Sequence, residues 1–182
     1  MRIIKTANRI WNILKGIVLN SIRIKDGEEI KREFREKQYQ AALKKKKRLI
    51  NSSLYEIDIM NGEEFEKYLE LCFKELNYAV KLTPKSKDYG ADLILYKDDV
   101  KIAVQTKRAK RPVGISAVQQ VTSAIKYYNA DKGMIITNNY FTRYAYNLAR
   151  SNEIELWDRK KLINFRFRVK NANVPPEKDN FR

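Results

Sequence analysis

Residues 88–108 read DYGADLILYKDDVKIAVQTKR. Side chains of opposite character alternate on both sides of Asp98-Asp99, which is typical of a β-hairpin with a tight turn at Lys97–Asp99. A turn centred between Asp98 and Asp99 places Asp92 directly across from Gln105, with Cβ atoms roughly 4.5–5.5 Å apart. Lys107 shares that face because side chains alternate along a strand. The opposite face is apolar and is predicted to meet the core through Leu93, Leu95, Ile102 and Val104.

The three polar side chains of this hairpin suit phosphodiester hydrolysis. Asp92 would bind a divalent cation, with the Gln105 side-chain oxygen and the Thr106 carbonyl as further ligands. Lys107 would orient the attacking water or stabilise negative charge in the transition state. An idle surface Asp–Lys pair fits the spacing equally well, because polar side chains commonly alternate outward in half-exposed sheets. The pattern alone leaves both interpretations open.

Composition narrows the choice of metal and of partner. The chain has 182 residues, 43% of them apolar, with a net charge of +16 that favours a polyanionic partner, either nucleic acid or an anionic membrane. A merely soluble basic protein is the alternative. The absence of histidine and the single Cys72, an expected core residue, exclude imidazole and thiolate metal sites. Any catalytic metal is therefore expected to have oxygen ligands, as Mg²⁺ or Mn²⁺ does.

The first 53 residues are predicted to be a basic helical extension, with 15 Lys/Arg against 5 Asp/Glu. An apolar helical stripe in residues 1–24 can pack on the catalytic domain or on another subunit as in a homodimer, or lie on an anionic membrane surface. Arg9 and Lys15 make it too polar to span a bilayer. The run Lys44–Arg48 is a solvated face or adds phosphate contacts. Met1–Asn20 lacks the features of a secretory signal, which predicts a cytoplasmic protein.

Residues 55–165 are predicted to form one α/β domain, since strands and helices alternate after the hairpin. A helix is expected from Asn61, with Glu64 completing a capping box, and another from Ser116 with Gln119 in the same role. Residues 166–182 are expected to be a flexible tail. The remaining elements are predicted as strands at 80–82, 133–137 and 154–157, and as helices at 28–49, 141–150 and 160–165.

The two motifs of the hairpin, Asp88-Tyr89-Gly90-Ala91-Asp92 and Val104-Gln105-Thr106-Lys107-Arg108, resemble the catalytic core of Mrr-type restriction endonucleases, a branch of the PD-(D/E)xK nuclease superfamily. The resemblance covers about 110 residues in consistent order. Its other segments are GEEFE (62–66), PVG (112–114), VQ (118–119), TNNYFT (137–142) and IELWD (154–158).

This resemblance implies a restriction-endonuclease-like fold, a central mixed β-sheet flanked by helices, and Mg²⁺-dependent cleavage of double-stranded DNA in restriction or defence. By motif position, Asp92 is the metal ligand and Lys107 the motif lysine. Gln105 stands where many members carry Glu or Asp and where Gln is usual in the Mrr-like branch. Glu66 corresponds to the acidic residue that the superfamily often places on its first core helix. An exposed glutamate is the alternative at Glu66.

Cations close to the site in sequence are expected to hold DNA phosphates. The residues predicted to bind DNA are Lys85, Lys87, Arg108, Lys110, Arg111 and Gln119. Asp88 is expected to be a turn residue before Gly90, with a ligand role as the alternative. A structure-specific resolvase or repair nuclease would use the same residues, and an inactive DNA-binding or membrane-associated protein would keep only the fold. Nothing in residues 1–53 resembles a winged-helix DNA reader, so base readout is expected to be minimal.

Overall fold

A computed structural model of the protein describes residues 11–12, 14–15, 27–84, 86 and 88–172. The chain divides between Lys45 and Lys46 into two compact units, rather than near residue 53 as the sequence suggested. The cause lies at the end of helix α2 (Gly27–Ile50), where Ile50 is buried in the core of the second unit and the Lys46 Nζ lies 2.6 Å from a Glu75 carboxylate oxygen. The apolar stripe in residues 1–24, with its subunit and membrane interpretations, falls almost wholly outside the described residues. In the described part of the chain, no helix has the length and apolar character needed to cross a membrane.

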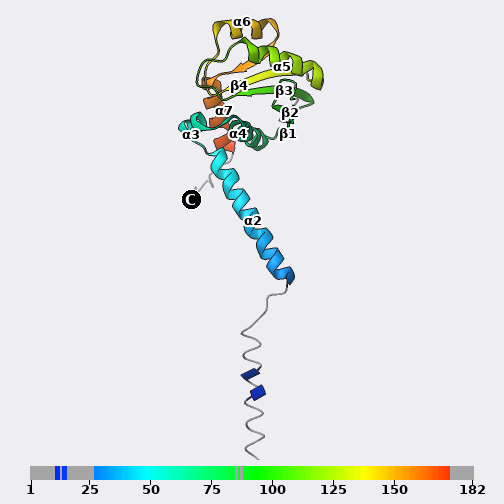
Figure 1. Ribbon diagram of the computed structural model, residues 1–182, viewed down its shortest axis with the longest axis vertical. Coiled ribbons are helices and arrows are strands. Elements are labelled where there is room, and N and C mark those ends of the chain that lie inside the picture. The colour runs from blue at the N-terminus through cyan, green and yellow to red at the C-terminus, as the bar shows by residue number, and fades with distance from the viewer. Residues whose placement is uncertain (1–10, 13, 16–26, 85, 87, 173–182) are drawn as a thin grey trace, which may run out of the picture. The chain divides into compact units, whose positions relative to one another are not determined.

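The second unit is a mixed five-stranded sheet between two layers of helices, with strand order β1-β2-β3-β4-β5 (Figure 1). The pairs β1–β2 and β2–β3 are antiparallel, whereas the pairs β3–β4 and β4–β5 are parallel. The strands are β1 (Ala79–Leu82), β2 (Leu93–Lys97), β3 (Val100–Lys107), β4 (Lys132–Thr137) and β5 (Ile154–Trp157). The helices are α3 (Leu54–Ile59), α4 (Gly62–Glu75), α5 (Ile115–Tyr128), α6 (Arg143–Ser151) and α7 (Arg159–Ala172).

The β2–β3 hairpin has the predicted register, in which Leu93 pairs with Val104 and Tyr96 with Lys101. Asp98 and Asp99 both have positive φ, 50° and 59°, as a two-residue turn that matches the strand twist requires. This turn centres the hairpin where the sequence placed it.

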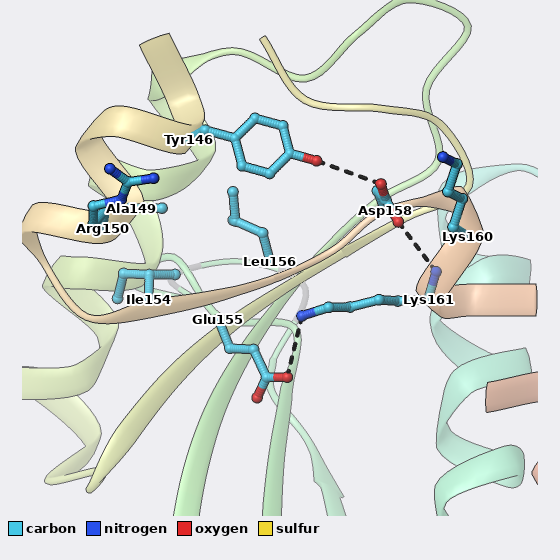
Figure 2. Close-up of a pocket in the computed structure, with 9 residues that line it drawn as sticks. All are labelled: Tyr146, Ala149, Arg150, Ile154, Glu155, Leu156, Asp158, Lys160 and Lys161. Atoms are coloured by element: carbon cyan, nitrogen blue, oxygen red, sulfur yellow. Dashed lines mark hydrogen bonds and ion pairs between the residues drawn. The ribbon is translucent and has the colours of Figure 1, made fainter. Parts of the chain in front are cut away.

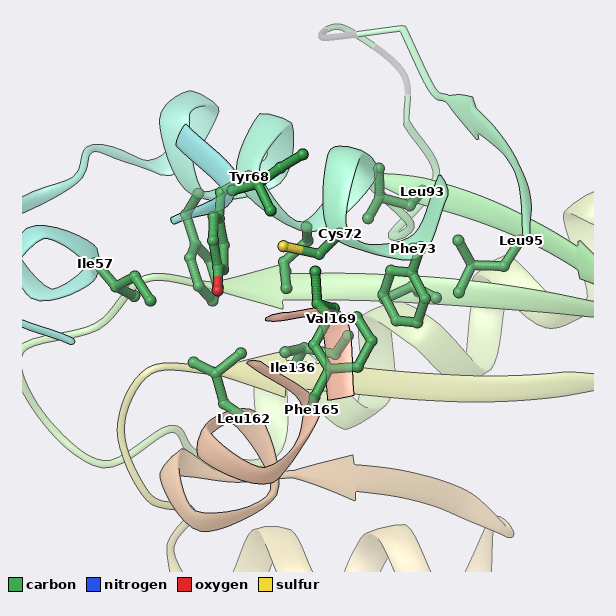
Figure 3. Close-up of a cluster of buried hydrophobic side chains, with 14 of the residues drawn as sticks. Ile57, Tyr68, Cys72, Phe73, Leu93, Leu95, Ile136, Leu162, Phe165 and Val169 are labelled. Carbon is green, nitrogen blue, oxygen red and sulfur yellow. The ribbon is translucent and has the colours of Figure 1, made fainter. Parts of the chain in front are cut away.

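Both faces of the sheet are buried, each under its own helices. The predicted core face of the hairpin packs against α4 and α7, in the cluster that Figure 3 shows. This cluster includes Cys72, as expected, and burial raises the pKa of its thiol to about 12. Ile94, Ala103 and Ile135, on the other face, lie in a second cluster with side chains of α5 and α6. The polar residues of the hairpin therefore lie at the end of a face that helices bury, and not on a solvent-exposed face of the sheet.

The helix boundaries show which sequence signals predict the ends of helices correctly and which do not. The predicted capping box of α4 is confirmed, because Asn61 and Glu64 bond each other's backbone N–H groups. The prediction that Ser116 caps α5 is wrong, since Gly114 is the N-cap residue and the helix begins at Ile115. Val113 forms a bridge with Phe141, which holds the chain extended up to the residue before that cap. Helix α7 continues to Ala172 and buries Val169, beyond the predicted start of the tail at residue 166.

Candidate active site

Asp92 stands immediately before β2, beyond the last regular pair of the hairpin, Leu93 with Val104. Its N–H donates to the Val104 carbonyl over 2.8 Å, and its carboxylate lies against the Gln105 side chain of β3. The Asp92 Oδ2 accepts hydrogen bonds from the Gln105 Nε2 at 2.6 Å, the Thr106 N–H at 2.6 Å and the Thr106 Oγ1 at 2.9 Å. Three donors on one oxygen hold the carboxylate in a single orientation.

Burial raises the pKa of Asp92 above its ordinary value. The bonds from Thr106 and the nearby positive charge of Lys107 act in the opposite direction, and the charge of Asp88 adds to the effect of burial. Desolvation has the larger effect on the pKa, so keeping Asp92 charged in the folded protein costs free energy. A bound cation would offset this cost.

A pocket of about 340 Å³ opens in front of this carboxylate. It brings together three parts of the predicted site: the hairpin residues Asp92, Gln105 and Lys107, the helix residue Glu66, and Arg108. The full lining is Gly62, Glu66, Asp88, Gly90, Asp92, Gln105, Thr106, Lys107, Arg108 and Gln120. Glu66 and Asp88 also line an adjoining pocket of about 160 Å³ with Asp92. Glu66 is therefore close to the site and is not merely an exposed residue of α4.

The oxygen atoms around Gln105 fit a divalent cation. The Gln105 Nε2 donates both to Asp92 Oδ2 and, at 3.3 Å, to the Thr106 carbonyl oxygen. Two oxygens thus converge on one donor group, and rotation of the amide by a half turn would bring Oε1 to the same place. In the described part of the chain, no three carboxylate, histidine or cysteine side chains gather as a metal site. Any ion here would therefore need the amide and backbone oxygens as well as Asp92.

The turn that leads into Asp92 is held by α5. The Asp88 Oδ1 accepts the Gly90 N–H at 3.1 Å, as expected for a turn residue, and its carbonyl accepts the Tyr128 hydroxyl at 3.0 Å. Tyr89 has a left-handed φ of 51° and stacks its ring on Tyr127, with centroids 3.7 Å apart. These contacts fix Asp88 in position. It is both a residue of the turn and a lining residue of the pocket.

The segment that leaves β3 at Lys107 is held by a network around Asp58 of α3. Arg159 of α7 makes a bidentate ion pair with Asp58, at 2.7 and 2.8 Å, and Asn138 donates to the same carboxylate. The Arg108 guanidinium donates to the Asp58 carbonyl at 3.2 Å, and the Asn138 Oδ1 accepts the N–H of Ala109. Residues distant in sequence thereby fix the chain next to the site.

We expect Arg159→Ala to lower the free energy of unfolding by about 2 kcal/mol, because it removes charge-assisted hydrogen bonds and leaves Asp58 charged without its partner. Urea denaturation at pH 7 measures this loss. Lys161→Ala is the matched control, since Lys161 pairs with Glu155 at 3.6 Å and is half exposed. The control should cost less than about 0.5 kcal/mol.

The same pair predicts a dependence on pH. The hydrogen bonds from Arg159 hold the pKa of Asp58 below its ordinary 3.8, although burial opposes them. A lowered carboxyl pKa stabilises the folded protein above the unfolded value, and this stabilisation is lost as pH falls through the folded value. The difference between wild type and Arg159→Ala should therefore shrink between pH 5 and pH 3. An unchanged difference would show that the ion pair is not its source.

The predicted DNA-binding residues have different positions. Arg108 lines the pocket, whereas Lys110 and Arg111 are exposed on the loop that follows. Lys85 and Lys87 lie outside the described residues. Gln119 is exposed on α5 and is not among the lining residues, while its neighbour Gln120 is. The roles of these residues in DNA binding remain predictions.

Sequence reasoning missed Gln120 and Gly62 as lining residues. Gly62 is the first residue of α4, and the capping box at Asn61 correctly predicts that position. The capping box carries no information about the pocket that Gly62 lines. Gln120 reaches the site because its backbone lies against Gly90. No local signal in the sequence reports that contact.

A separate pocket of about 480 Å³ lies between α6, β5 and the start of α7 (Figure 2). Within it, the Tyr146 hydroxyl donates to Asp158 at 3.4 Å, and the Lys161 ammonium lies 3.6 Å from a Glu155 carboxylate oxygen. None of the residues assigned to catalysis lines it.

The mixed sheet, its flanking helices and the pocket at Asp92 have the arrangement of a restriction-endonuclease-type domain. The restriction endonuclease family model Mrr_cat matches residues 57–165. The chain therefore belongs to this family, as its sequence motifs suggested, and its fold is the predicted mixed sheet flanked by helices.

Individual relatives are more distant. The uncharacterised protein y4cE of Sinorhizobium fredii is 27% identical over 127 residues, which cover 65% of this chain and 32% of that protein. The match thus spans about a third of the length of this curated relative.

Three solved structures are also similar. The protein of unknown function AF1548 aligns with 14% identity and a TM-score of 0.49, over 63% of this chain and 71% of that one. The DNA modification-dependent restriction endonuclease AspBHI aligns with 20% identity and a TM-score of 0.48, over 71% of this chain and 36% of that one. The restriction endonuclease MspJI, in complex with a 27-mer oligonucleotide, aligns with 19% identity and a TM-score of 0.44, over 67% and 35%.

Proposed function

We propose that this protein is a Mg²⁺-dependent DNA endonuclease of the restriction or defence type, which hydrolyses phosphodiester bonds of double-stranded DNA at the Asp92 pocket. The observation that carries the proposal is the convergence of Asp92, Gln105 and Lys107 on one pocket within a domain of the restriction endonuclease family. An idle surface ion pair is a poor description of this geometry, because the Asp92 carboxylate accepts hydrogen bonds from Gln105 and Thr106, which are only 4% and 6% exposed. The net charge of +16 suits a DNA substrate.

Asp92, Gln105 and the Thr106 carbonyl would hold the metal, since the Asp92 and Thr106 oxygens converge on the Gln105 amide, whose Oε1 would face them after a half turn. A bound Mg²⁺ would supply Lewis-acid polarisation of the phosphoryl group and a lowered pKa for a water molecule. Glu66 lines the same pocket, and its carboxylate would be a further acceptor, either for water or for the metal's hydration shell.

Lys107 acts on the phosphate from the end of β3. Its charge lowers the pKa of Asp92, and both side chains line the same pocket. There it donates a hydrogen bond to the attacking water or to a phosphoryl oxygen, where negative charge grows in the transition state. Thr137 holds the Lys107 carbonyl at 2.6 Å, which fixes the backbone from which this side chain extends.

Incubation with supercoiled plasmid tests the proposal. With Mg²⁺ we expect nicked and linear DNA, and with EDTA instead of Mg²⁺ no cleavage. Lys107→Met keeps the length of the aliphatic stem but removes the charge, and should lower the initial rate by about a hundredfold to a thousandfold. If wild type leaves every plasmid form intact in Mg²⁺ and in Mn²⁺, the proposal is wrong.

A further inference from the structure

A second pocket adjoins the active site, between the β1–β2 end of the sheet and the C-terminal part of α5. Its volume is about 520 Å³, within the range of roughly 300–1,000 Å³ in which small-molecule sites fall. It is lined by Lys81, Leu82, Thr83, Pro84, Ile94, Tyr96, Lys101, Tyr127 and Tyr128. Nothing in the catalytic roles described above uses this pocket.

The lining combines aromatic rings with positive charge. Among the described residues it includes three tyrosines and two lysines, and no carboxylate. Tyr96 and Tyr127 are 41% and 55% exposed, so their rings are accessible to a ligand. Aromatic faces and cations are the groups with which proteins hold unpaired nucleotides, because a ring stacks on the base and a cation pairs with the phosphate.

Both rings are already held in place. The Lys101 Nζ lies 5.7 Å from the centroid of the Tyr96 ring and donates to the Tyr128 carbonyl. Tyr127 stacks on Tyr89 at an interplanar angle of 18°. Ordering these side chains before binding reduces the entropy that a ligand must overcome.

The pocket lies next to the one that contains the candidate catalytic carboxylate of Asp92. It shares Thr83 and Pro84 with the pocket that Glu66, Asp88 and Asp92 line. The Thr83 N–H donates to the Asp92 carbonyl at 3.0 Å, so the two sites share a wall. A DNA strand with a phosphate at Asp92 would therefore carry a neighbouring nucleotide past this pocket.

We propose that this pocket binds an unpaired nucleobase of the DNA strand whose phosphate lies at Asp92. A base inside a duplex is stacked and paired, and only one that leaves the stack can enter a protein pocket. The substrate class is thereby DNA with a single-stranded or locally opened segment next to the cleaved bond. The position of that phosphate rests on the proposed nuclease function, whereas binding of the base does not.

Binding in EDTA separates the two proposals. Fluorescence anisotropy would compare a labelled single-stranded oligonucleotide with a blunt duplex of the same sequence. We expect Tyr96→Ala and Tyr127→Ala each to weaken single-strand binding about tenfold, and duplex binding less than about twofold. Tyr127→Phe keeps the ring and should bind as wild type does. Tyr96→Ala is the sharper variant, because Tyr127 also supports the turn at Tyr89.

Tyr144→Ala is the matched control, since Tyr144 is 76% exposed on α6 and lines neither this pocket nor that of Asp92. It should leave both affinities unchanged. Equal losses for single strand and duplex, or no loss in the Tyr96 and Tyr127 variants, would overturn the base-binding inference. If plasmid is cut but these variants bind normally, only this inference fails. If they lose single-strand binding but no DNA is cut, only the nuclease proposal fails.

Discussion

Asp92→Asn is expected to lower the rate of Mg²⁺-dependent plasmid cleavage by at least about a thousandfold, because a metal site loses its one charged hairpin ligand. Asparagine keeps the shape of the side chain and an oxygen that can accept the Thr106 N–H, which lies 2.6 Å from Asp92 Oδ2. The variant therefore removes charge rather than packing. The initial rate of nicking, measured with enzyme in excess over plasmid, gives the size of the effect.

The same substitution should not destabilise the metal-free protein at neutral pH. Burial raises the pKa of Asp92 in the folded state, so the folded protein binds a proton there more tightly than the unfolded chain does. The contribution of Asp92 to the free energy of unfolding therefore rises as pH falls. At pH 7 the group is charged, and its burial destabilises the folded protein by the full amount. We expect the Tm of Asp92→Asn in EDTA to equal or exceed that of wild type. Mg²⁺ should raise the Tm of wild type only.

Two results would contradict this assignment. Cleavage by Asp92→Asn within about tenfold of the wild-type rate would place the chemistry elsewhere. A marked drop in the Tm of the metal-free variant would instead mean that its inactivity reports loss of fold.

Gly90→Ala is expected to destabilise the fold by about 3 kcal/mol or more and to abolish cleavage. Gly90 has a φ of +93°, which side chains other than glycine rarely adopt. An added Cβ would lie 2.2 Å from the Gln120 carbonyl oxygen and 2.6 Å from its carbon. These atoms belong to the backbone of α5, so relief requires a shift of the helix or of the turn that leads into Asp92. Urea denaturation measures the loss of stability.

Gly62→Ala is the matched control for stability. Apart from its chain neighbours and the backbone of α4 itself, no atom of the described residues lies within 4 Å of a Cβ built at Gly62, which is in the first turn of α4. Alanine there should leave the free energy of unfolding unchanged or raise it by up to about 1 kcal/mol. If Gly90→Ala were as stable as Gly62→Ala, the close approach of the turn to α5 would not constrain the fold.

Much of the hairpin could be predicted because its signals are local. Alternation and the Asp98-Asp99 turn determine the register, and the register alone places Asp92 across from Gln105. The helix α4 is equally local, because its cap and apolar stripe lie within the helix itself. Helix α3 was missed, although Ser53 and Glu56 carry the capping-box pattern, since six residues are too few to show an apolar periodicity.

Other features depend on contacts between distant parts of the chain. The start of α5 could not be read at Ser116 because the bridge between Val113 and Phe141 sets it. The pairing of Asp58 with Arg159 joins residues 101 positions apart. Neither has a local signature, since each is formed only when the sheet brings the segments together.

The amino-acid sequence by itself determined which residues face one another on the hairpin, and through its motifs the family to which the chain belongs. It also limited any metal to oxygen ligands, because the chain has no histidine and one buried cysteine. Only the tertiary structure decided that Glu66 and Gln120 join the Asp92 pocket and that a tyrosine-lined pocket adjoins it. The reason is physical: register follows from short-range alternation, whereas a pocket exists only where helices close over the sheet.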